Sequence, residues 1–281
     1  MNLKSIPATV SLMVCTLMAS SQVTTPSSIF TNKGNDQDSV EIVTVGSIMP
    51  YNISPFNWGS LKEIMNPSIF KWWLNGNANG YDLLKSDGIT PLTPLPPPNN
   101  VYYPDSSISI HWLKTGKYRI KVNEKSEPKT KIKLCDNSSD IQTLSVLVLD
   151  RPTASWDSAI SKSGCNFINT TQYAPVTVKS SGKTIITYTL VYTPQSGAVT
   201  TQTGLTQTFN SLGNDTLNSV SIPINITGYG TYEIAITGIT DKIATKCGIV
   251  SQPADVPSDK YTITVLSDLE TSPIQFVREL K

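Results

Sequence analysis

Residues 107–122 read SISIHWLKTGKYRIKV, and residues 221–236 read SIPINITGYGTYEIAI. Both stretches place two isoleucines two residues apart, and a glycine six residues after the second opens the pattern G-x-Y-x-I-x-[VI]. Each copy continues to a cysteine and to a final alternating run, LSVLVL at 144–149 and YTITVL at 261–266. The copies lie 114 residues apart, close to the length of one β-sandwich domain. The sequence therefore predicts two tandem domains of the same construction.

The repeat also extends towards the N-terminus of each copy. Residues 70–74 read FKWWL, and the same 114-residue offset leads to 184–188, inside the alternating run TIITYTLVY. Alternation of apolar side chains places them on one face of a strand. We therefore expect a matching strand in each domain, with Trp72 corresponding to Ile186.

Composition favours an exported all-β protein. The chain has 22 basic and 21 acidic residues and only 15% charged residues, which argues against a nucleic-acid partner because phosphates require a basic face. Thr, Ser, Asn and Val suit strands and solvated turns, and no segment has a sustained helical period. The predicted fold class is all-β, with two tandem immunoglobulin-like or PKD-like β-sandwich domains after a signal peptide.

The domain organisation follows from composition changes along the chain. Residues 1–21 combine Lys4, an apolar stretch and an A-x-S cleavage site, which is typical of a signal peptide. Residues 22–38 are predicted to be a flexible leader, 39–150 the first sandwich, and 151–281 the second with a C-terminal tail. No later segment is apolar for long enough to span a membrane. The protein is therefore expected at the cell surface, in the medium or in the periplasm.

The parts that do not repeat are predicted to be loops. Residues 46–65 carry two prolines and two glycines, and 75–104 contain TPLTPLPPPNN, which we interpret as a stiff connector or, alternatively, a docking ridge. The matching stretch of the second domain, 194–219, is rich in Gln, Thr, Gly and Asn and is also predicted to be a loop. Function is expected in these segments and in the tail.

The tyrosine of each repeated motif has a structural interpretation. In immunoglobulin-like sandwiches, a tyrosine near the start of a late strand returns its hydroxyl to upstream backbone and holds a corner. Tyr118 and Tyr232 occupy that place, each two residues after a glycine that permits a tight turn. We interpret both as structural tyrosine corners; a ligand-contact role is the alternative.

Export changes the interpretation of the cysteines. Removal of Cys15 with the signal peptide leaves Cys135, Cys165 and Cys247. An oxidising compartment permits a disulfide, and Cys165 with Cys247 is the pair that lies within one predicted domain. The alternative is that all three are small buried side chains.

Three aromatic residues of the first domain are candidate ligand contacts. Trp58, Tyr102 and Tyr103 would suit stacking on a sugar or a peptide. The alternative is that these rings cover the ends of the sandwich.

The sequence argues against an enzyme. Nucleophilic catalysis usually needs a base, and His111 is the single histidine of the chain, within a short alternating strand. Asp150, Asp157 and Asp241 stand in predicted turns, where Asp bonds local backbone. No nucleophile-elbow, P-loop or zinc-protease motif occurs. We assign no catalytic, cofactor-binding or metal residue.

The motifs FKWWLNG, SISIHW, G-x-Y-x-I-x-V and LSVLVL together resemble the PKD-like repeats of proteins exported by Bacteroidetes. The ending YTITVLSDLETSPIQFVREL resembles the tail of related surface proteins, and the resemblance covers about 40–281. Two departures are Cys135, which follows Leu134 instead of glycine, and Ser272, which replaces the usual glycine of the tail.

The resemblance implies an envelope address. It implies a structural or protein-binding component with a protein partner, accessory to gliding or type IX secretion or cargo of that system. For cargo, the whole second domain with its tail 267–281 would be the signal; the favoured alternative is that this tail packs across its own sandwich. The alternative is an adhesin-like module that contacts carbohydrate.

Overall fold

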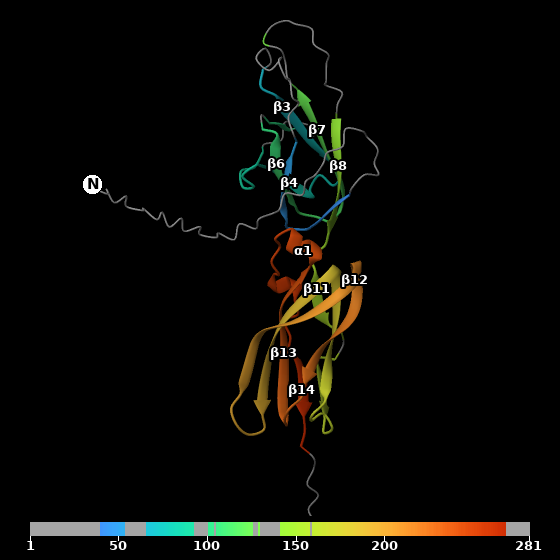
Figure 1. Ribbon diagram of the computed structural model, residues 1–281, viewed down its shortest axis with the longest axis vertical. Helices are drawn as coiled ribbons and strands as arrows, with labels where there is room; N and C mark the ends of the chain where they lie inside the picture. The colour runs from blue at the N-terminus through green and yellow to red at the C-terminus, as the bar shows by residue number, and fades with distance from the viewer. Residues whose placement is uncertain are drawn as a thin grey trace, which may run out of the picture.

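The computed structural model describes residues 40–53, 66–92, 101–103, 105–125, 129, 141–157 and 159–267. The signal peptide, the leader, Trp58, the proline run, Cys135 and the C-terminal tail lie outside these residues. The described chain forms two β-sandwiches that follow one another along the long axis, with a short helix at their junction (Figure 1). Among the described residues, no helix is long and apolar enough to cross a membrane.

The first domain contains eight strands in two sheets. One sheet has the order β1-β8-β7-β3-β5 and the other β2-β6-β4. The strands are β1 Glu41–Thr44, β2 Ile48–Asn52, β3 Ile69–Asn75, β4 Tyr81–Lys85, β5 Val101–Tyr103, β6 Ser107–Trp112, β7 Gly116–Lys125 and β8 Ile141–Leu149. Among the described strand pairs of this domain, β1–β8 is parallel and the others are antiparallel.

The second domain is built around a long hairpin. Its strands are β9 Thr153–Trp156, β10 Ser161–Gly164, β11 Thr171–Pro194, β12 Thr200–Asn225, β13 Gly230–Asp241 and β14 Tyr261–Val265. The C-terminal part of β11 and the N-terminal part of β12 belong to the sheet β10-β14-β13-β11-β12. Their other parts pair with each other, and β11 also pairs with β9. Bulges near Gly182, whose φ is 77°, carry β11 from one layer to the other.

Apolar alternation fills both cores as the repeated motif predicts. Burial alternates along β3, β7 and β8 in the first domain and along β13 and β14 in the second. Trp72 and Trp112 are fully buried in the core of the first domain. Ile120 of that core and its counterpart Ile234 in the core of the second domain are also fully buried. The fold class is therefore two tandem immunoglobulin-like sandwiches, with the short α1 Lys242–Lys246 and the 3-10 turn η2 Pro253–Asp255 as the helices of the described chain.

The structure corrects the register of the earlier strand. Trp72 pairs with Val122 across β3 and β7. The counterpart of Val122, Ile236, pairs with Tyr188 instead of Ile186. The same two-residue offset holds from Tyr188 to Pro194, so β11 and β13 pair in a different register from β3 and β7.

Three predicted loops contain strands. β2 lies within the expected loop 46–65, β4 and β5 lie within 75–104, and β12 runs through most of 194–219. The Thr- and Gln-rich sequence of β12 resembles a loop because it has little apolar alternation. It forms a strand because β11 supplies a partner along nearly its full length.

Candidate binding groove and domain junction

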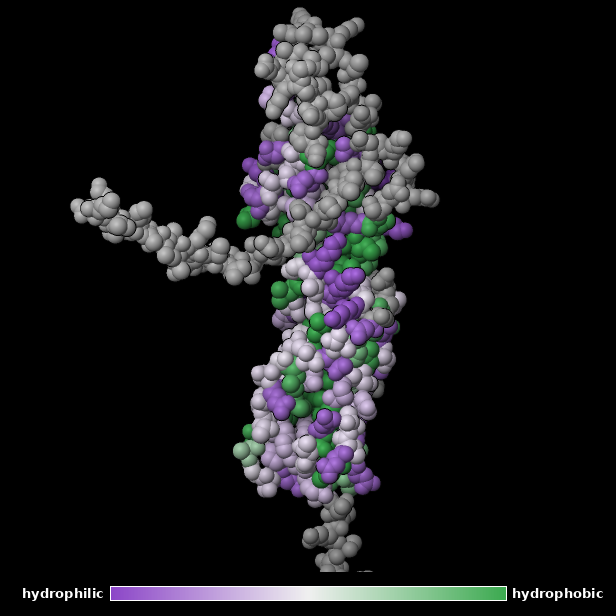
Figure 2. Space-filling model, in the orientation of Figure 1, coloured by the Kyte–Doolittle hydropathy of each residue, from purple (hydrophilic) through white to green (hydrophobic). Residues whose placement is uncertain are grey.

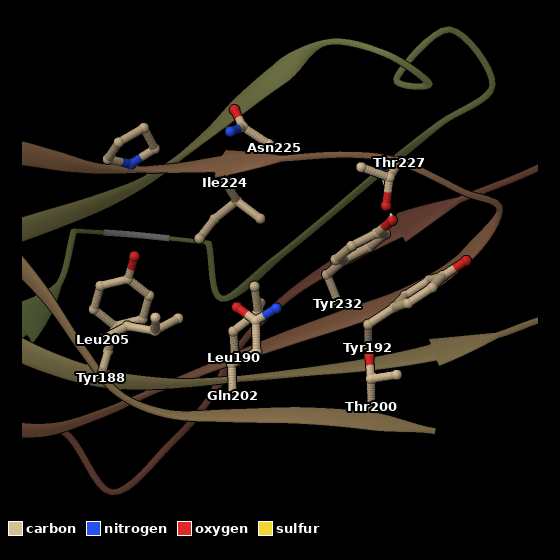
Figure 3. Close-up of a pocket in the computed structure, with 11 residues that line it drawn as sticks. Tyr188, Leu190, Tyr192, Thr200, Gln202, Leu205, Ile224, Asn225, Thr227 and Tyr232 are labelled. Atoms are coloured by element: carbon tan, nitrogen blue, oxygen red, sulfur yellow. Dashed lines mark hydrogen bonds between the residues drawn. The ribbon is translucent and has the colours of Figure 1, made fainter. Parts of the chain in front are cut away.

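A groove of about 370 Å³ opens on one side of the second domain, between the two sheets. The C-terminal half of β11 forms its floor with Tyr188, Leu190 and Tyr192, and β13 adds Tyr232 (Figure 3). The two parts of β12 form opposite walls, because this strand is at the edge of both layers. These walls carry Thr200, Gln202 and Leu205 on one side and Pro223, Ile224, Asn225 and Thr227 on the other.

Two stacked tyrosines close one end of the groove. The rings of Tyr192 and Tyr232 lie 4.4 Å apart between centroids at 19°, and they are seen nearly parallel in Figure 3. The Tyr192 hydroxyl donates to the carbonyl of Tyr229 at 2.9 Å. Gly228 permits this approach, since a Cβ there would lie 2.3 Å from the Tyr192 hydroxyl oxygen. The pair is therefore fixed before any ligand arrives.

The groove is electrically neutral. Its lining contains tyrosine, aliphatic, hydroxyl and amide side chains, without Asp, Glu, Lys or Arg. Burial raises the pKa of the Tyr188 phenol, so this group stays protonated at neutral pH. Figure 2 shows mainly pale residues over the second domain, in keeping with its few charges. Such a lining suits an uncharged ligand with apolar groups and hydrogen-bonding edges.

Both motif tyrosines bond the backbone that precedes them. The Tyr118 hydroxyl donates to the carbonyl of Lys114 at 2.9 Å. The Tyr232 hydroxyl donates to the carbonyl of Gly228 at 3.2 Å and accepts from the amides of Thr227 and Gly228, each at 3.0 Å. Tyr118 therefore makes the contact that defines a tyrosine corner. Tyr232 makes the same kind of contact and also contributes its ring to the groove.

A charged contact holds the connection between the two domains against the second domain. Arg151, in the three-residue connection between β8 and β9, donates from Nε to both carboxylate oxygens of Asp255 at 3.1 Å. Its Nη2 atom lies 2.8 Å from Asp255 Oδ2 and 2.6 Å from the carbonyl oxygen of Val250. Asp255 is 6% exposed, so this contact is shielded and has the bidentate geometry that orients both groups.

The segment around α1 also enters the core of the first domain. Asp241 caps the helix by accepting from the amide of Ala244 at 2.7 Å, and its other oxygen accepts from Ser181 at 2.8 Å. Cys247, at the helix end, is 4% exposed and belongs to the first-domain core, while Ile243 and Ile249 pack against that core. The second domain thus supplies part of the first domain's apolar packing.

A buried carboxylate faces this helix from the first domain. Glu41 on β1 is 9% exposed, and its Oε1 atom lies 3.7 Å from Lys246 Nζ, an ion-pair distance that is too long for a hydrogen bond. Burial raises the pKa of Glu41, and the Lys246 ammonium opposes that shift only in part. Desolvation also raises the pKa of the Cys247 thiol, so the thiol is protonated and unreactive at neutral pH.

The predicted disulfide is not formed. Cys165 and Cys247 are both free; the former is exposed and the latter is buried. Cys247 belongs to the same sequence domain as Cys165 but packs into the core of the other sandwich. The predicted pair would require the core of each domain to be filled only from that domain's own sequence, and Cys247 departs from this.

Of the other residues considered in the sequence, the structure describes Tyr102, Tyr103 and His111 but not Trp58. The backbones of Tyr102 and Tyr103 lie in β5, opposite Lys71 and Phe70 of β3, and Trp58 is outside the described chain. His111 is partly exposed, with Nδ1 3.6 Å from Asp82 Oδ2. Among the described residues, no group of three or more His, Cys, Asp or Glu side chains could hold a metal ion.

Among the groove residues, the sequence pointed to Tyr232 alone, and its preferred interpretation was structural. Tyr188, Tyr192 and Leu205 belong to alternating or polar strand sequence, so their side chains were assigned to the core or to a loop. The available signal was the run of threonine and glutamine in β12, which is long for a loop in a compact domain.

Comparison with known proteins gives no family for this chain. No protein-family model matches the chain, and no curated protein matches it. Similar solved structures include the calcium-binding domain pair CBD12 of CALX1.1 (10% identical, 80% of this chain and 96% of that chain, TM-score 0.29). A titin I-band fragment, I67–I69, is 9% identical over 80% of this chain and 61% of that chain, with a TM-score of 0.26.

A third similar structure is the CsuC–CsuE chaperone and tip-adhesion subunit complex of Acinetobacter baumannii pili. It is 10% identical over 66% of this chain and 98% of that chain, with a TM-score of 0.24. At these scores the likenesses assign no activity. The sheet order and the corner tyrosines define the chain as a tandem immunoglobulin-like β-sandwich protein.

Proposed function

We propose that this protein is a non-enzymatic, exported component of the cell envelope that binds another protein through a stiff two-domain rod. The observation that carries the proposal is the junction between the domains. There the segment around α1 of the second domain packs into the core of the first, and Arg151 donates hydrogen bonds to both carboxylate oxygens of Asp255. Domains that share core packing and a buried ion pair resist the swing expected of a plain linker. The rod would hold the groove at a fixed distance from the first domain.

The address rests on the sequence. The N-terminal segment has signal-peptide character, and the motifs resemble envelope proteins of Bacteroidetes. We propose an accessory role in gliding or type IX secretion, or transport as cargo of that system. Deletion of 267–281 separates the two: loss of surface display marks cargo, whereas unchanged display leaves an accessory component.

Stiffness is tested by spin labels in each domain. Ile89 and Leu217 are 81% and 72% exposed, so Ile89→Cys and Leu217→Cys provide label sites in a chain whose Cys15, Cys135 and Cys165 are serine. We expect one narrow distance distribution from electron-electron double resonance, broadened by Arg151→Ala. A broad distribution in the parent chain would remove the structural basis of the proposal.

The binding role is tested in the host cell. Cells that produce a tagged chain are fractionated, and photo-crosslinking residues are introduced at exposed sites of both domains. The proposal expects the chain in the envelope or outside the cell, shortened at its N-terminus, with discrete crosslinks to a protein. Retention of the full-length chain in the cytoplasm, or crosslinks to glycan alone, would refute it.

A further inference from the structure

Among the residues that the structure describes, the edge of the second domain lacks a strand that the first domain has. In the first domain, β6 is flanked by β2 and β4. The repeated motif makes Ile222–Ile226 the counterpart of Ile108–Trp112, and this part of β12 has β11 as its single strand partner within the described chain. The side on which β4 lies in the first domain is the side on which the groove opens in the second.

Backbone hydrogen bonds show that the same sides correspond. The amide of Trp112 donates to the carbonyl of Ser47 and its carbonyl accepts from Gly46, on the β2 side. In the second domain, the amide of Ile226 donates to the carbonyl of Thr170, and its carbonyl accepts from the amide of Asn169, on the β11 side. Because N–H and C=O groups alternate in direction along a strand, Pro223 and Asn225 face the open side.

One backbone group marks where the missing strand would begin. In the first domain, the amide of Leu113 donates to the carbonyl of Gly80, immediately before β4. In the second, the corresponding amide of Thr227 donates to the Tyr232 hydroxyl instead. Within the described chain, the next outward-facing residue, Asn225, has no such substitute, and there its amide and carbonyl are open to a strand.

The first domain also shows what fills the space behind the edge. Tyr81 and Leu83 of β4 point inwards; Leu83 pairs with Ile110 and is 8% exposed. The Tyr81 ring contacts Trp112 and Tyr118 at centroid distances of 6.4 and 6.1 Å. The counterpart of Ile110 is Ile224, which lines the groove. An incoming strand would therefore place apolar or aromatic side chains over Ile224 and Leu205.

We propose that the groove binds an extended segment of a protein partner, added antiparallel to the Pro223–Asn225 edge in the position that β4 occupies in the first domain. This rests on the protein-binding role proposed above and names the site and the kind of partner. The inward side chains of the segment that lie over the groove are uncharged, to match the neutral lining, and the residue opposite Asn225 points outwards and can be charged, as Asp82 is on β4.

Pro223 limits the register. It offers a carbonyl but no amide to the open side, so two bonds centred on Asn225 and one to the Pro223 carbonyl are the backbone contacts available. The partner residue opposite Pro223 keeps its own carbonyl in water. This arrangement also disfavours edge-to-edge pairing of two copies.

The test uses the full chain and a capped peptide that copies residues 79–86, NGYDLLKS. Nuclear magnetic resonance should show peptide-dependent shifts confined to 188–192, 200–205 and 223–232, with slowed exchange of the Asn225 amide. Gln202→Glu places a charge in the groove with little change of shape and should weaken peptide binding at least fivefold. Thr201→Glu, on the opposite face of the same strand, should leave it unchanged. The same is expected of a peptide control in which Tyr and the first Leu stay and only the outward Asp is replaced by Asn.

Other occupants give different results, and each would overturn the proposal. Protection of Asn225 in the free chain that is lost in Phe276→Asp would identify the chain's own tail. Concentration-dependent protection would identify a second copy, and shifts with neutral oligosaccharides but not with the peptide would identify a sugar site. Absence of peptide-induced shifts would also refute the groove, while a protein crosslink elsewhere would leave the proposed function intact.

Discussion

The two domains repeat the same strands around the same tyrosine corner and differ at one sheet edge. In the first domain, Tyr81 of β4 covers the Tyr118 ring, and Gly76 lies opposite that ring, where a Cβ would come within 2.5 Å of the Tyr118 Cδ1 atom. In the second, Tyr192 stands opposite Tyr232 and stacks on it, and no strand follows the outer edge of Ile222–Ile226 within the described chain. The first domain covers this edge with its own β4, and the described part of the second leaves a lined groove there.

The largest effect is expected in the aromatic cluster that holds β4. Trp112 is fully buried and contacts Tyr51, Tyr81 and Tyr118. Trp112→Ala should lower the free energy of unfolding by about 3–5 kcal/mol and expose β4 to hydrogen exchange. The counterpart Ile226→Ala should cost about 2–3 kcal/mol without changing exchange at an outer strand. Urea denaturation gives both values; equal exchange responses in the two domains would contradict the comparison.

The second-largest loss of stability is expected at the junction between the domains. Arg151→Ala leaves Asp255 shielded and without its cation, and removal of one partner from a buried pair costs about 3–5 kcal/mol. Because Arg151 is 21% exposed, we expect about 2 kcal/mol. Lys179→Ala breaks the nearby exposed pair with Asp150 and should cost less than about 0.5 kcal/mol. Denaturant midpoints of the two variants compare them, and a smaller loss for Arg151→Ala than for Lys179→Ala would argue against a stiff junction.

Removal of the two corner hydroxyls should lower the free energy of unfolding by different amounts. Tyr118→Phe removes one hydrogen bond, to Lys114, and should cost about 1 kcal/mol. Tyr232→Phe removes three and leaves the Thr227 and Gly228 amides without that acceptor, so we expect about 2 kcal/mol. Thermal or urea unfolding measures the pair. The account fails at this point if Tyr118→Phe is the more damaging substitution.

The smallest effect concerns pH. The pKa of Glu41 is raised from its ordinary value of 4.5, first by burial. Stability from the protonated carboxyl is fully present below the unfolded-state pKa and is lost as pH rises through the folded-state pKa. Glu41→Gln should therefore gain stability relative to the parent as pH rises above about 4.5. Urea midpoints across that range check the sign, and a difference that shrinks with rising pH would show that the Lys246 pair dominates.

The repeated motif predicted the class of fold because alternation is a local property. Ile120, Val122 and their counterparts each bury one face whatever the rest of the chain does, so the strands around G-x-Y were found. The edge strands were missed because Tyr81–Lys85 is short and β12 is polar, and only pairing with β6 and β11 makes them strands. The groove depends on a strand that is absent at one edge, which no local pattern records.

The domain boundary shows a second limit. The sequence assigned Cys247 to the second domain, and its chain position agrees, but its side chain packs in the first core. Contacts between domains join residues about 200 positions apart, as Glu41 and Lys246 do. Periodicity within a window of a dozen residues carries no information about such contacts.

The central claim, that one edge is covered and its counterpart is open, is tested most directly by amide hydrogen exchange in the free chain. His111 and Asn225 are counterparts, and only His111 faces a neighbouring strand on that side. We predict a His111 amide that exchanges only when β4 opens and an Asn225 amide that exchanges at close to the rate of unprotected backbone. Equal protection of the two amides would contradict the account.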